Sequence, residues 1–115
     1  YIQYAHARIK RIIDDLKQQD IKKEALNNLN TKNENQLIEL ISLYQDTINK
    51  SIREIRPDII TNYLYKLSQV FHSYYAETKI LSSEIKGEKI LLIKCVDKII
   101  LNGFQLLDIE PMDVM

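Results

Sequence analysis

The chain has 115 residues, of which 45% are hydrophobic and 28% are charged, and its 16 basic residues balance its 16 acidic ones. This length fits one domain with one modest core, since a chain of this size buries roughly two-thirds of the surface that its unfolded form exposes. An integral membrane protein is excluded because the sequence has no run of about eighteen apolar residues, and the amphipathic opening is not a secretory signal. The balanced charge also lacks the overall positive field that steers many nucleic-acid-binding proteins.

The apolar pattern predicts an all-α fold. Only two glycines and two prolines occur, and most of the chain follows an apolar period near 3.6, so we expect a helical bundle with about four main helices. The first helix is predicted over 2–16, with six apolar positions on one side of the cylinder: Ile2, Ala5, Ile9, Ile12, Ile13 and Leu16. Residues 20–35 are rich in Asn and Lys and are expected to form a flexible linker.

A second and a third helix follow the linker. Thr31 and Glu34 resemble a capping box, which predicts a helix start, and an apolar stripe then repeats every three or four residues as far as Pro57. Its members are Leu37, Ile41, Tyr44, Ile48, Ile52 and Ile55. Pro57 is expected in the first turn of the third helix, because its missing N–H is harmless there. This helix should end near residue 81, with Ile60, Leu64, Leu67, Phe71 and Tyr74 in the core.

The fourth helix is predicted over 88–107, after a loop at 82–87. It is apolar almost all round, through Ile90, Leu91, Ile93, Val96, Ile99, Ile100 and Leu101, and we expect it to be the most buried of the four. The pair Asn102-Gly103 is expected to distort or end it. Four apolar residues near the end of the chain are expected to seal the base of the bundle: Phe104, Leu106, Leu107 and Ile109.

The cysteine and histidine content limits the chemistry of the chain. Cys95 is the only cysteine, so an internal disulfide is excluded, and one Cys with His6 and His72 cannot fill a tetrahedral zinc site. We interpret Cys95 as a small core residue and not as a nucleophile. A reducing compartment follows, and we expect a cytoplasmic protein, with an organellar form as the alternative. Tyr1 in place of an initiating Met indicates a fragment of a longer chain.

Three segments, in order, resemble a known family. Residues 1–9, Tyr-Ile-Gln-Tyr-Ala-His-Ala-Arg-Ile, resemble the opening of the C-terminal helical domain of arginyl-tRNA synthetases. Residues 57–75 resemble its third-helix segment, with Phe71-His72-Ser73-Tyr74-Tyr75 at the end. The close of the chain is similar too, with Asn102-Gly103, paired Leu, Ile, Pro and a terminal Met115, although Asp108 stands where a Gly is usual. The chain is identified as a member of the DALR anticodon-binding group.

This resemblance implies a recognition domain without catalytic residues. It has no cofactor of its own, whereas the parent enzyme would use ATP and Mg²⁺ to attach arginine to tRNA(Arg). The partners implied are tRNA(Arg) and a catalytic domain of the same chain, with no membrane or DNA partner.

Helical geometry and the resemblance point to the same candidate surface. Tyr4, Arg8 and Arg11 lie on one strip beside the core stripe of the first helix. The strip offers an aromatic plane and two cations to unpaired bases, which proteins bind by stacking. Further candidate contacts are Tyr75, His72 and Met115, the last because the family's terminal Met lies near the anticodon surface.

Other interpretations of the same residues stay open. From the residues alone, an aromatic at the edge of a core is the more typical interpretation of Tyr4, and a solvated face is the more typical interpretation of Arg8 and Arg11. His72 lies beside an apolar stripe, where a lone His is more often a packing residue, whereas Tyr63 and Tyr74 are expected in the core. For the whole chain, the alternatives are a non-catalytic helical module that binds proteins and the anticodon domain of a cysteinyl-type synthetase.

Overall fold

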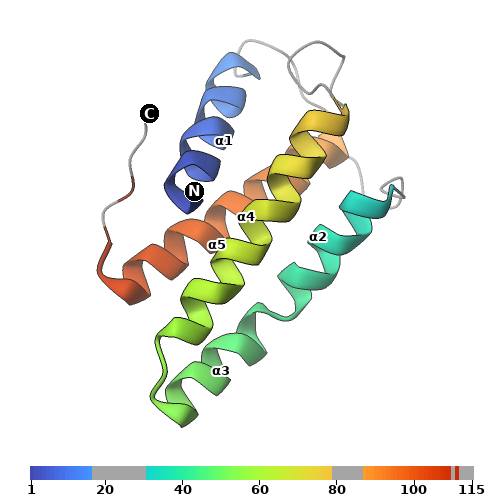
Figure 1. Cartoon of the computed structure of the whole chain (residues 1–115). Helices are drawn as coiled ribbons and strands as arrows, with labels where there is room; N and C mark the ends of the chain where they lie inside the picture. Colours follow the sequence, from blue (N-terminus) through green and yellow to red (C-terminus); the bar gives the residue numbers. More distant parts are fainter. Residues whose placement is uncertain (17–30, 79–86, 110, 112–115) are drawn as a thin grey trace.

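The computed structural model describes residues 1–16, 31–78, 87–109 and 111. Five helices form the described part: α1 (Ile2–Leu16), α2 (Lys32–Ser42), α3 (Tyr44–Glu54), α4 (Asp58–Thr78) and α5 (Gly87–Leu107). The described residues contain no strand, so the predicted all-α class is confirmed. The two long helices α4 and α5 cross, α2 and α3 run along α4, and α1 lies beside α4 and α5 (Figure 1).

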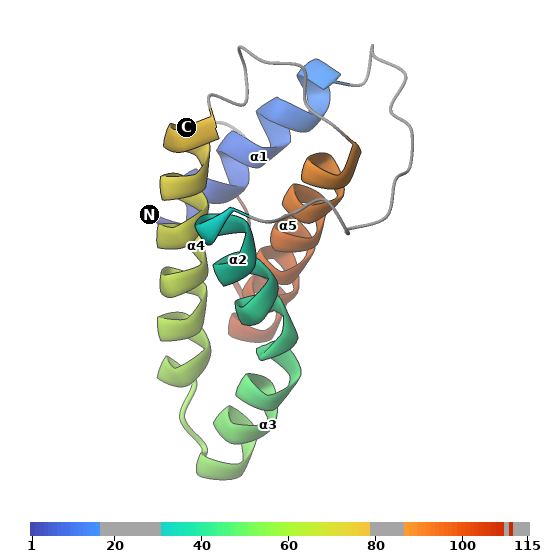
Figure 2. The same cartoon turned by 90° about the vertical axis from the view of Figure 1, so that its right-hand side faces the viewer.

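Helix α4 is the centre of the bundle, because it contacts each of the other four helices. Turned by 90°, the molecule shows α2 and α3 as one bent arm lying along α4 (Figure 2). The core stripe predicted for this helix is confirmed, since Ile60, Leu64, Leu67, Phe71 and Tyr74 are all buried. Tyr63 is buried as expected, and its hydroxyl donates to the backbone carbonyl of Leu40 on α2.

The predicted second helix is divided in two at Leu43, where the expectation of one helix was wrong. Hydroxyl side chains bond to backbone carbonyls on both sides of the break, a pattern that bends helices. The hydroxyl of Ser42 donates to the Glu39 carbonyl at 2.6 Å, and that of Thr47 donates to the Leu43 carbonyl at 2.8 Å. The break turns α3 relative to α2, so a single apolar stripe does not continue along both.

The capping box predicted at the start of α2 is confirmed. Thr31 Oγ1 accepts from the Glu34 N–H at 3.2 Å, and the Thr31 N–H donates to Glu34 Oε1 at 3.0 Å. Residues 32–35, expected to end the flexible linker, therefore form the first turn of a helix. The remainder of the expected linker that precedes Thr31 falls on 20–30, outside the described residues.

The α3–α4 connection forms the tip of the bundle. Ile55 ends α3 in a left-handed conformation, with φ 53° and ψ 51°, and Pro57 supplies the carbonyl that accepts from Ile60 and Thr61 at the start of α4. Ile52 and Ile55 were expected in the core, but they are 68% and 87% exposed. That expectation was wrong because both residues lie near the end of the bundle, where their side chains stay open to solvent.

Helix α5 runs without interruption through Asn102-Gly103 to Leu107, contrary to the expected distortion or end. Gly103 instead allows α5 to pack closely against α4, because a Cβ at this position would lie 2.6 Å from Cδ1 of Leu64 on α4. The helix ends at Asp108, which has φ 58°. The Ile109 N–H donates to the Phe104 carbonyl at 2.8 Å, as in a Schellman motif, whose left-handed position is usually occupied by Gly.

Two expectations about the apolar residues of α5 need correction. Ile90, Ile93, Val96, Ile99 and Ile100 are buried as predicted, but Leu91 is exposed and Leu101 is half-buried. Phe104 is buried, whereas Leu106 and Ile109 are exposed and so do not seal the base. The physical reason is that the neighbouring helices cover one side of α5 and leave the other open. Cys95 is half-buried at the margin of the core.

Candidate nucleic-acid interface

Six side chains from α1, α4 and the residue that precedes α1 form one aromatic–arginine cluster: Tyr1, Tyr4, Arg8, Tyr65, His72 and Tyr75. Helical periodicity explains how α1 contributes to it, since residues four apart share a face. The packing of α1 against α4 then brings the two halves together. Tyr4 is 37% exposed, and Tyr1 and Tyr65 are exposed more, so aromatic surface faces the solvent.

Arg8 lies at the centre of the cluster. Its guanidinium carbon is 4.4 Å from the ring centroid of Tyr4 and 4.2 Å from that of Tyr75, which are cation–π distances. Its Nη2 donates to the Tyr4 hydroxyl at 2.6 Å, and its Nη1 lies 3.1 Å from Nδ1 of His72. The side chain therefore joins the two helices through ring contacts and hydrogen bonds.

His72 accepts from Arg8 as a neutral imidazole. Because Arg8 can only donate, Nδ1 must be the unprotonated nitrogen, and the proton lies on Nε2. Burial lowers the pKa of His72, and the nearby positive charge of Arg8 lowers it further. A hydrogen bond with the Tyr1 backbone acts in the opposite direction but does not outweigh them. The ring also packs on its neighbours, with its centroid 4.8 Å from that of Tyr1 and 5.4 Å from that of Tyr4.

One buried nitrogen of the cluster has no hydrogen-bond partner: Nε of Arg8, which is always an N–H donor. A buried donor without an acceptor is costly, and such groups in folded proteins are few. The cluster is therefore well packed but incompletely paired.

The structure brings four of the six sequence-predicted site residues together and leaves two apart. Tyr4, Arg8, His72 and Tyr75 are in direct contact. Arg11 is exposed one turn beyond Arg8 and makes none of the contacts of the cluster. Met115 lies outside the described residues.

Tyr1 and Tyr65 are the members that sequence reasoning missed. Their ring centroids lie 4.9 Å apart, although 64 positions separate them in the chain. The available signal for Tyr1 was its spacing, three residues before Tyr4 on the same face of a helix. Tyr65 precedes His72 by seven residues, or about two turns of α4, which also places the two on one face.

A buried pair on the opposite side of α1 fixes how the helix is rotated. Nδ1 of His6 lies 2.6 Å from Oδ1 of Asp97 on α5, and His6 is 3% exposed. At about 100° per residue, His6 points away from Tyr4 and Arg8. Its contact with α5 therefore turns these two side chains toward α4.

A second polar network anchors α4 beside the cluster. Glu34 is 1% exposed, and its Oε2 accepts from the Tyr74 hydroxyl at 2.6 Å. Burial acts to raise the pKa of Glu34, but hydrogen bonds from Tyr74 and Thr31, together with the charge of Lys89, outweigh it and lower the pKa. The pKa of Tyr74 is raised, first by burial and then by its bond to Glu34. Glu34 is therefore an ionised, paired residue that holds α2 to α4.

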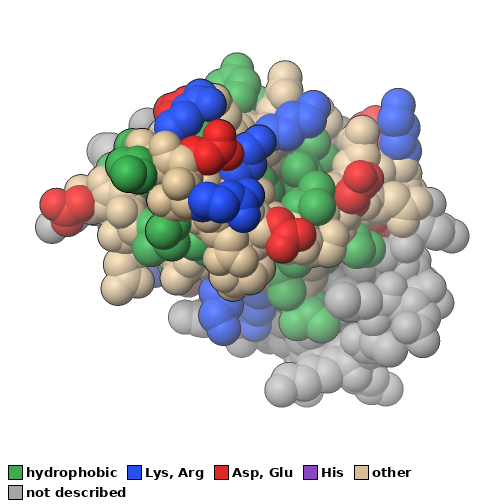
Figure 3. All heavy atoms as spheres, turned by 90° about the horizontal axis from the view of Figure 1, so that it is seen from below, with side chains coloured by type: hydrophobic (Ala, Val, Ile, Leu, Met, Phe, Trp, Pro, Cys, Tyr) green, Lys and Arg blue, Asp and Glu red, His purple; other side chains and the backbone are tan. Residues whose placement is uncertain are grey.

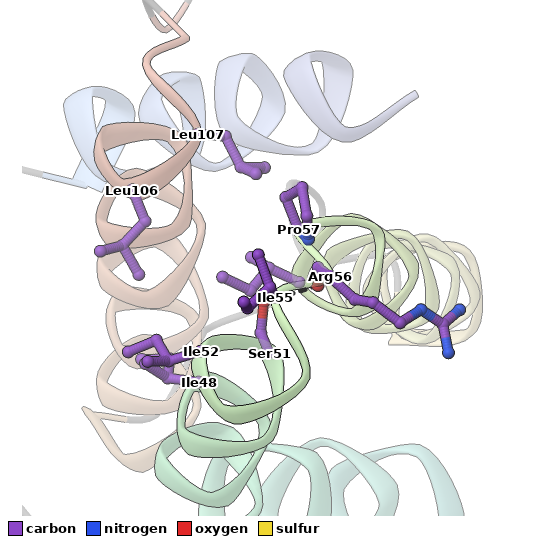
Figure 4. Close-up of a pocket in the computed structure, with 9 residues that line it drawn as sticks. Ile48, Ser51, Ile52, Ile55, Arg56, Pro57, Leu106 and Leu107 are labelled. Carbon is purple, nitrogen blue, oxygen red and sulfur yellow. Dashed lines mark hydrogen bonds between the residues drawn. The ribbon is translucent and has the colours of Figure 1, made fainter.

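A separate pocket of about 280 Å³ lies at the tip. Ile48, Ile52, Ile55, Leu106 and Leu107 supply most of its lining, and Arg56 points away from it toward solvent (Figure 4). The guanidinium of Arg56 pairs with Asp58 at 2.7 Å, and both side chains are exposed. Viewed from this end, the molecule shows apolar side chains scattered among charged ones (Figure 3). The pocket gathers few polar groups, so its chemistry differs from that of the cluster.

Metal binding and membrane insertion have no counterpart in the described ranges. Among these residues, no three His, Cys, Asp or Glu side chains gather closely enough to hold a metal ion. None of the helices within the same ranges combines the length and the apolar character needed to cross a bilayer.

Comparison with known proteins finds a matching family and several relatives. A family model described as the DALR anticodon binding domain matches residues 2–115. The arginine–tRNA ligase of Ureaplasma parvum serovar 3 is 34% identical over 119 residues, which cover 100% of this chain and 21% of that protein. The ligase of Borrelia hermsii is 35% identical over 120 residues, covering 100% of this chain and 20% of the relative. That of Methanocaldococcus jannaschii is 32% identical over 115 residues, covering 96% and 20%.

The chain thus spans about a fifth of the length of the curated relatives it matches. The family match extends over nearly all of it, including both helices that build the aromatic–arginine cluster. The chain belongs to the DALR anticodon binding domain family.

Proposed function

We propose that this chain is the anticodon-recognition domain of an arginine–tRNA ligase and that the aromatic–arginine cluster is where it contacts unpaired bases of tRNA(Arg). The observation that carries the proposal is the joining of Tyr4, Arg8, His72 and Tyr75 into one partly exposed surface. Single-stranded RNA is recognised by stacking its bases on aromatic rings and guanidinium planes and by hydrogen bonds to the base edges. The cluster offers both kinds of group.

The neutral net charge of the chain is compatible with this role. A base stacked on an aromatic side chain is worth about 1–3 kcal/mol, so two or three contacts supply substantial binding energy without a large positive field. In the parent protein, other segments would contribute most contacts to the phosphate backbone. Local geometry at the cluster would then decide which loop is accepted.

The parent activity follows from the same proposal. It is an ATP-dependent ligase that esterifies arginine to tRNA(Arg), with ATP and Mg²⁺ bound in a catalytic domain of the same polypeptide. The relatives named above are arginine–tRNA ligases, which supports this assignment over a cysteinyl-type enzyme. The 115 residues contribute recognition and no catalytic group.

Chemical footprinting of an arginine tRNA bound to the full-length protein tests the function. We expect the anticodon nucleotides to be protected, and the protection to weaken as salt is raised, since phosphate contacts release counterions. A cysteine tRNA under the same conditions is the matched control and should remain unprotected. Anticodon nucleotides as reactive as those of free arginine tRNA would rule the proposal out.

A further inference from the structure

The guanidinium of Arg8 occupies the surfaces on which a base would stack. It lies within 4.4 Å of the Tyr4 ring centroid and within 4.2 Å of the Tyr75 ring centroid. Like a nucleobase, it is flat and delocalised and packs face-on against aromatic rings. While it stays there, the ring faces that it covers are closed to RNA.

The bonds that hold Arg8 are few and exchangeable. One goes to the Tyr4 hydroxyl and one to Nδ1 of the neutral His72, whereas Arg8 Nε has no acceptor. Arg8 is only half-buried, and its stem has several rotatable bonds. Its head group can therefore swing outward without unfolding either helix.

We propose that Arg8 is a built-in stand-in for a nucleobase, and that an unpaired base enters the cluster by displacing its guanidinium from Tyr4 and Tyr75. This inference rests on the proposed function and adds how the site is regulated. The base takes over the ring contacts, and the guanidinium moves out to the RNA backbone. A phosphate accepts two parallel N–H bonds from an Arg fork, so Arg8 Nε gains the partner that it lacks in the free chain.

This exchange makes the free site selective as well as closed. A ligand that offers a flat ring without a nearby anion gives the released guanidinium no hydrogen-bond acceptor. Displacement of Arg8 by such a ligand is therefore unfavourable. An RNA loop supplies the ring and the phosphate together. The expected ligand class is therefore a nucleotide within a flexible single strand, in preference to a free base or a paired stem.

The position of Arg8 is measured directly by the ¹H–¹⁵N NMR signal of its Nε–H group, assigned from the spectrum of an Arg8→Lys chain. The rings of Tyr4 and Tyr75 should shift this signal upfield in the free 115-residue chain. On titration with the anticodon stem–loop of arginine tRNA, we expect the signal to move to the range of an Arg in contact with no ring. Saturating RNA that leaves the upfield shift in place overturns the proposal.

A substitution at His72 tests the same exchange through affinity. His72→Phe keeps a ring against Tyr1 and Tyr4 but removes one of the two acceptors of Arg8. Since one net hydrogen bond is lost from the closed state, we expect the stem–loop to bind about 2- to 10-fold more tightly. Tyr44→Phe is the control, because Tyr44 contacts Tyr63 and Asn102 away from the cluster, and it should leave affinity unchanged.

The outcomes separate the two proposals. Equal or weaker binding by His72→Phe overturns displacement while leaving anticodon recognition intact. Absence of salt-dependent binding in the wild type and in every variant removes both. Circular dichroism of His72→Phe verifies that its helices are formed before affinities are compared.

Discussion

The hydroxyl of Tyr74 donates a 2.6 Å hydrogen bond to the buried carboxylate of Glu34. The next residue of α4 is Tyr75, whose ring contacts Arg8 in the cluster. Tyr74 faces the core and Tyr75 its edge, so the bond to Glu34 fixes the rotation of α4 at the place where the cluster forms. Stability and site geometry are thus set by the same turn of one helix.

Loss of this bond should destabilise the fold. Tyr74→Phe keeps the buried ring but leaves the Glu34 carboxylate with one donor fewer, and hydrogen bonds to charged groups are worth roughly 1.5–3 kcal/mol. We expect the free energy of unfolding in urea to fall by about that amount. Tyr65→Phe, in which the hydroxyl belongs to an exposed side chain, is the matched control and should change stability little. Equal losses in the two variants would contradict the assigned role of Glu34.

Glu34 should also make stability depend on acid. Its pKa in the folded chain is below the ordinary value of 4.5, so folding favours the ionised form. The resulting stabilisation is fully present above pH 4.5 and is lost as pH falls through the lowered pKa. Between about pH 5 and pH 3, the wild type should lose more free energy of unfolding than Glu34→Gln, in which this group no longer titrates. Parallel stability curves for the two proteins would refute the prediction.

A strained residue ends α3. Ile55 has φ 53° and is 87% exposed, and a left-handed conformation costs a residue other than Gly about 1–2 kcal/mol. Ile55→Gly removes this strain, but it also raises the conformational entropy of the unfolded chain, which offsets part of the gain. We expect a net gain of about 1 kcal/mol in urea denaturation. Ile52→Gly, three residues earlier within the helix, should instead lower the free energy of unfolding by about 1 kcal/mol. The two substitutions must therefore change the free energy of unfolding in opposite directions.

Close packing of α4 against α5 makes Gly103 intolerant of a side chain. The Cβ of Gly103→Ala would lie 2.6 Å from Cδ1 of the buried Leu64. Overpacking typically costs 1–3 kcal/mol, and the better helix propensity of Ala offsets about 1 kcal/mol. We expect a net loss of about 1 kcal/mol, smaller in a Leu64→Val background, where space is available. Additive effects of the two substitutions would show that the contact is not the cause.

Local rules account for most of the helices and for little of the contact geometry. The α4 stripe and the Thr31–Glu34 capping box were predictable because both depend on residues three or four apart. The break at Leu43 was not, because a periodic stripe does not show which backbone carbonyls the hydroxyl groups of Ser42 and Thr47 will bond. Exposure of Ile52 depends on where the bundle ends, which a periodic stripe does not encode.

The aromatic–arginine cluster was also predictable only in part. Tyr4 and Arg8 were placed on one strip by helical geometry, and the family resemblance favoured the same strip. The contacts of Arg8 with His72 and Tyr75 depend on how α1 crosses α4, which no local pattern specifies. Arg11 satisfies the same spacing rule, but its side chain is exposed and makes none of the contacts of the cluster. The spacing rule alone could not distinguish it from Tyr4 and Arg8.

Substitutions at Tyr4 separate two ways in which this residue could serve RNA binding. If its ring stacks on a base, Tyr4→Ala should weaken binding of the anticodon stem–loop by about 1–3 kcal/mol, measured by fluorescence anisotropy. Tyr4→Phe keeps the ring and removes only the hydroxyl that accepts from Arg8, so, like His72→Phe, it should bind about 2- to 10-fold more tightly than the wild type. Ile52→Ala, at the exposed tip, controls for loss of apolar surface. If Tyr4→Phe weakened binding as much as Tyr4→Ala, the hydroxyl and its bond to Arg8 would be the functional feature, and stacking on Tyr4 would be excluded.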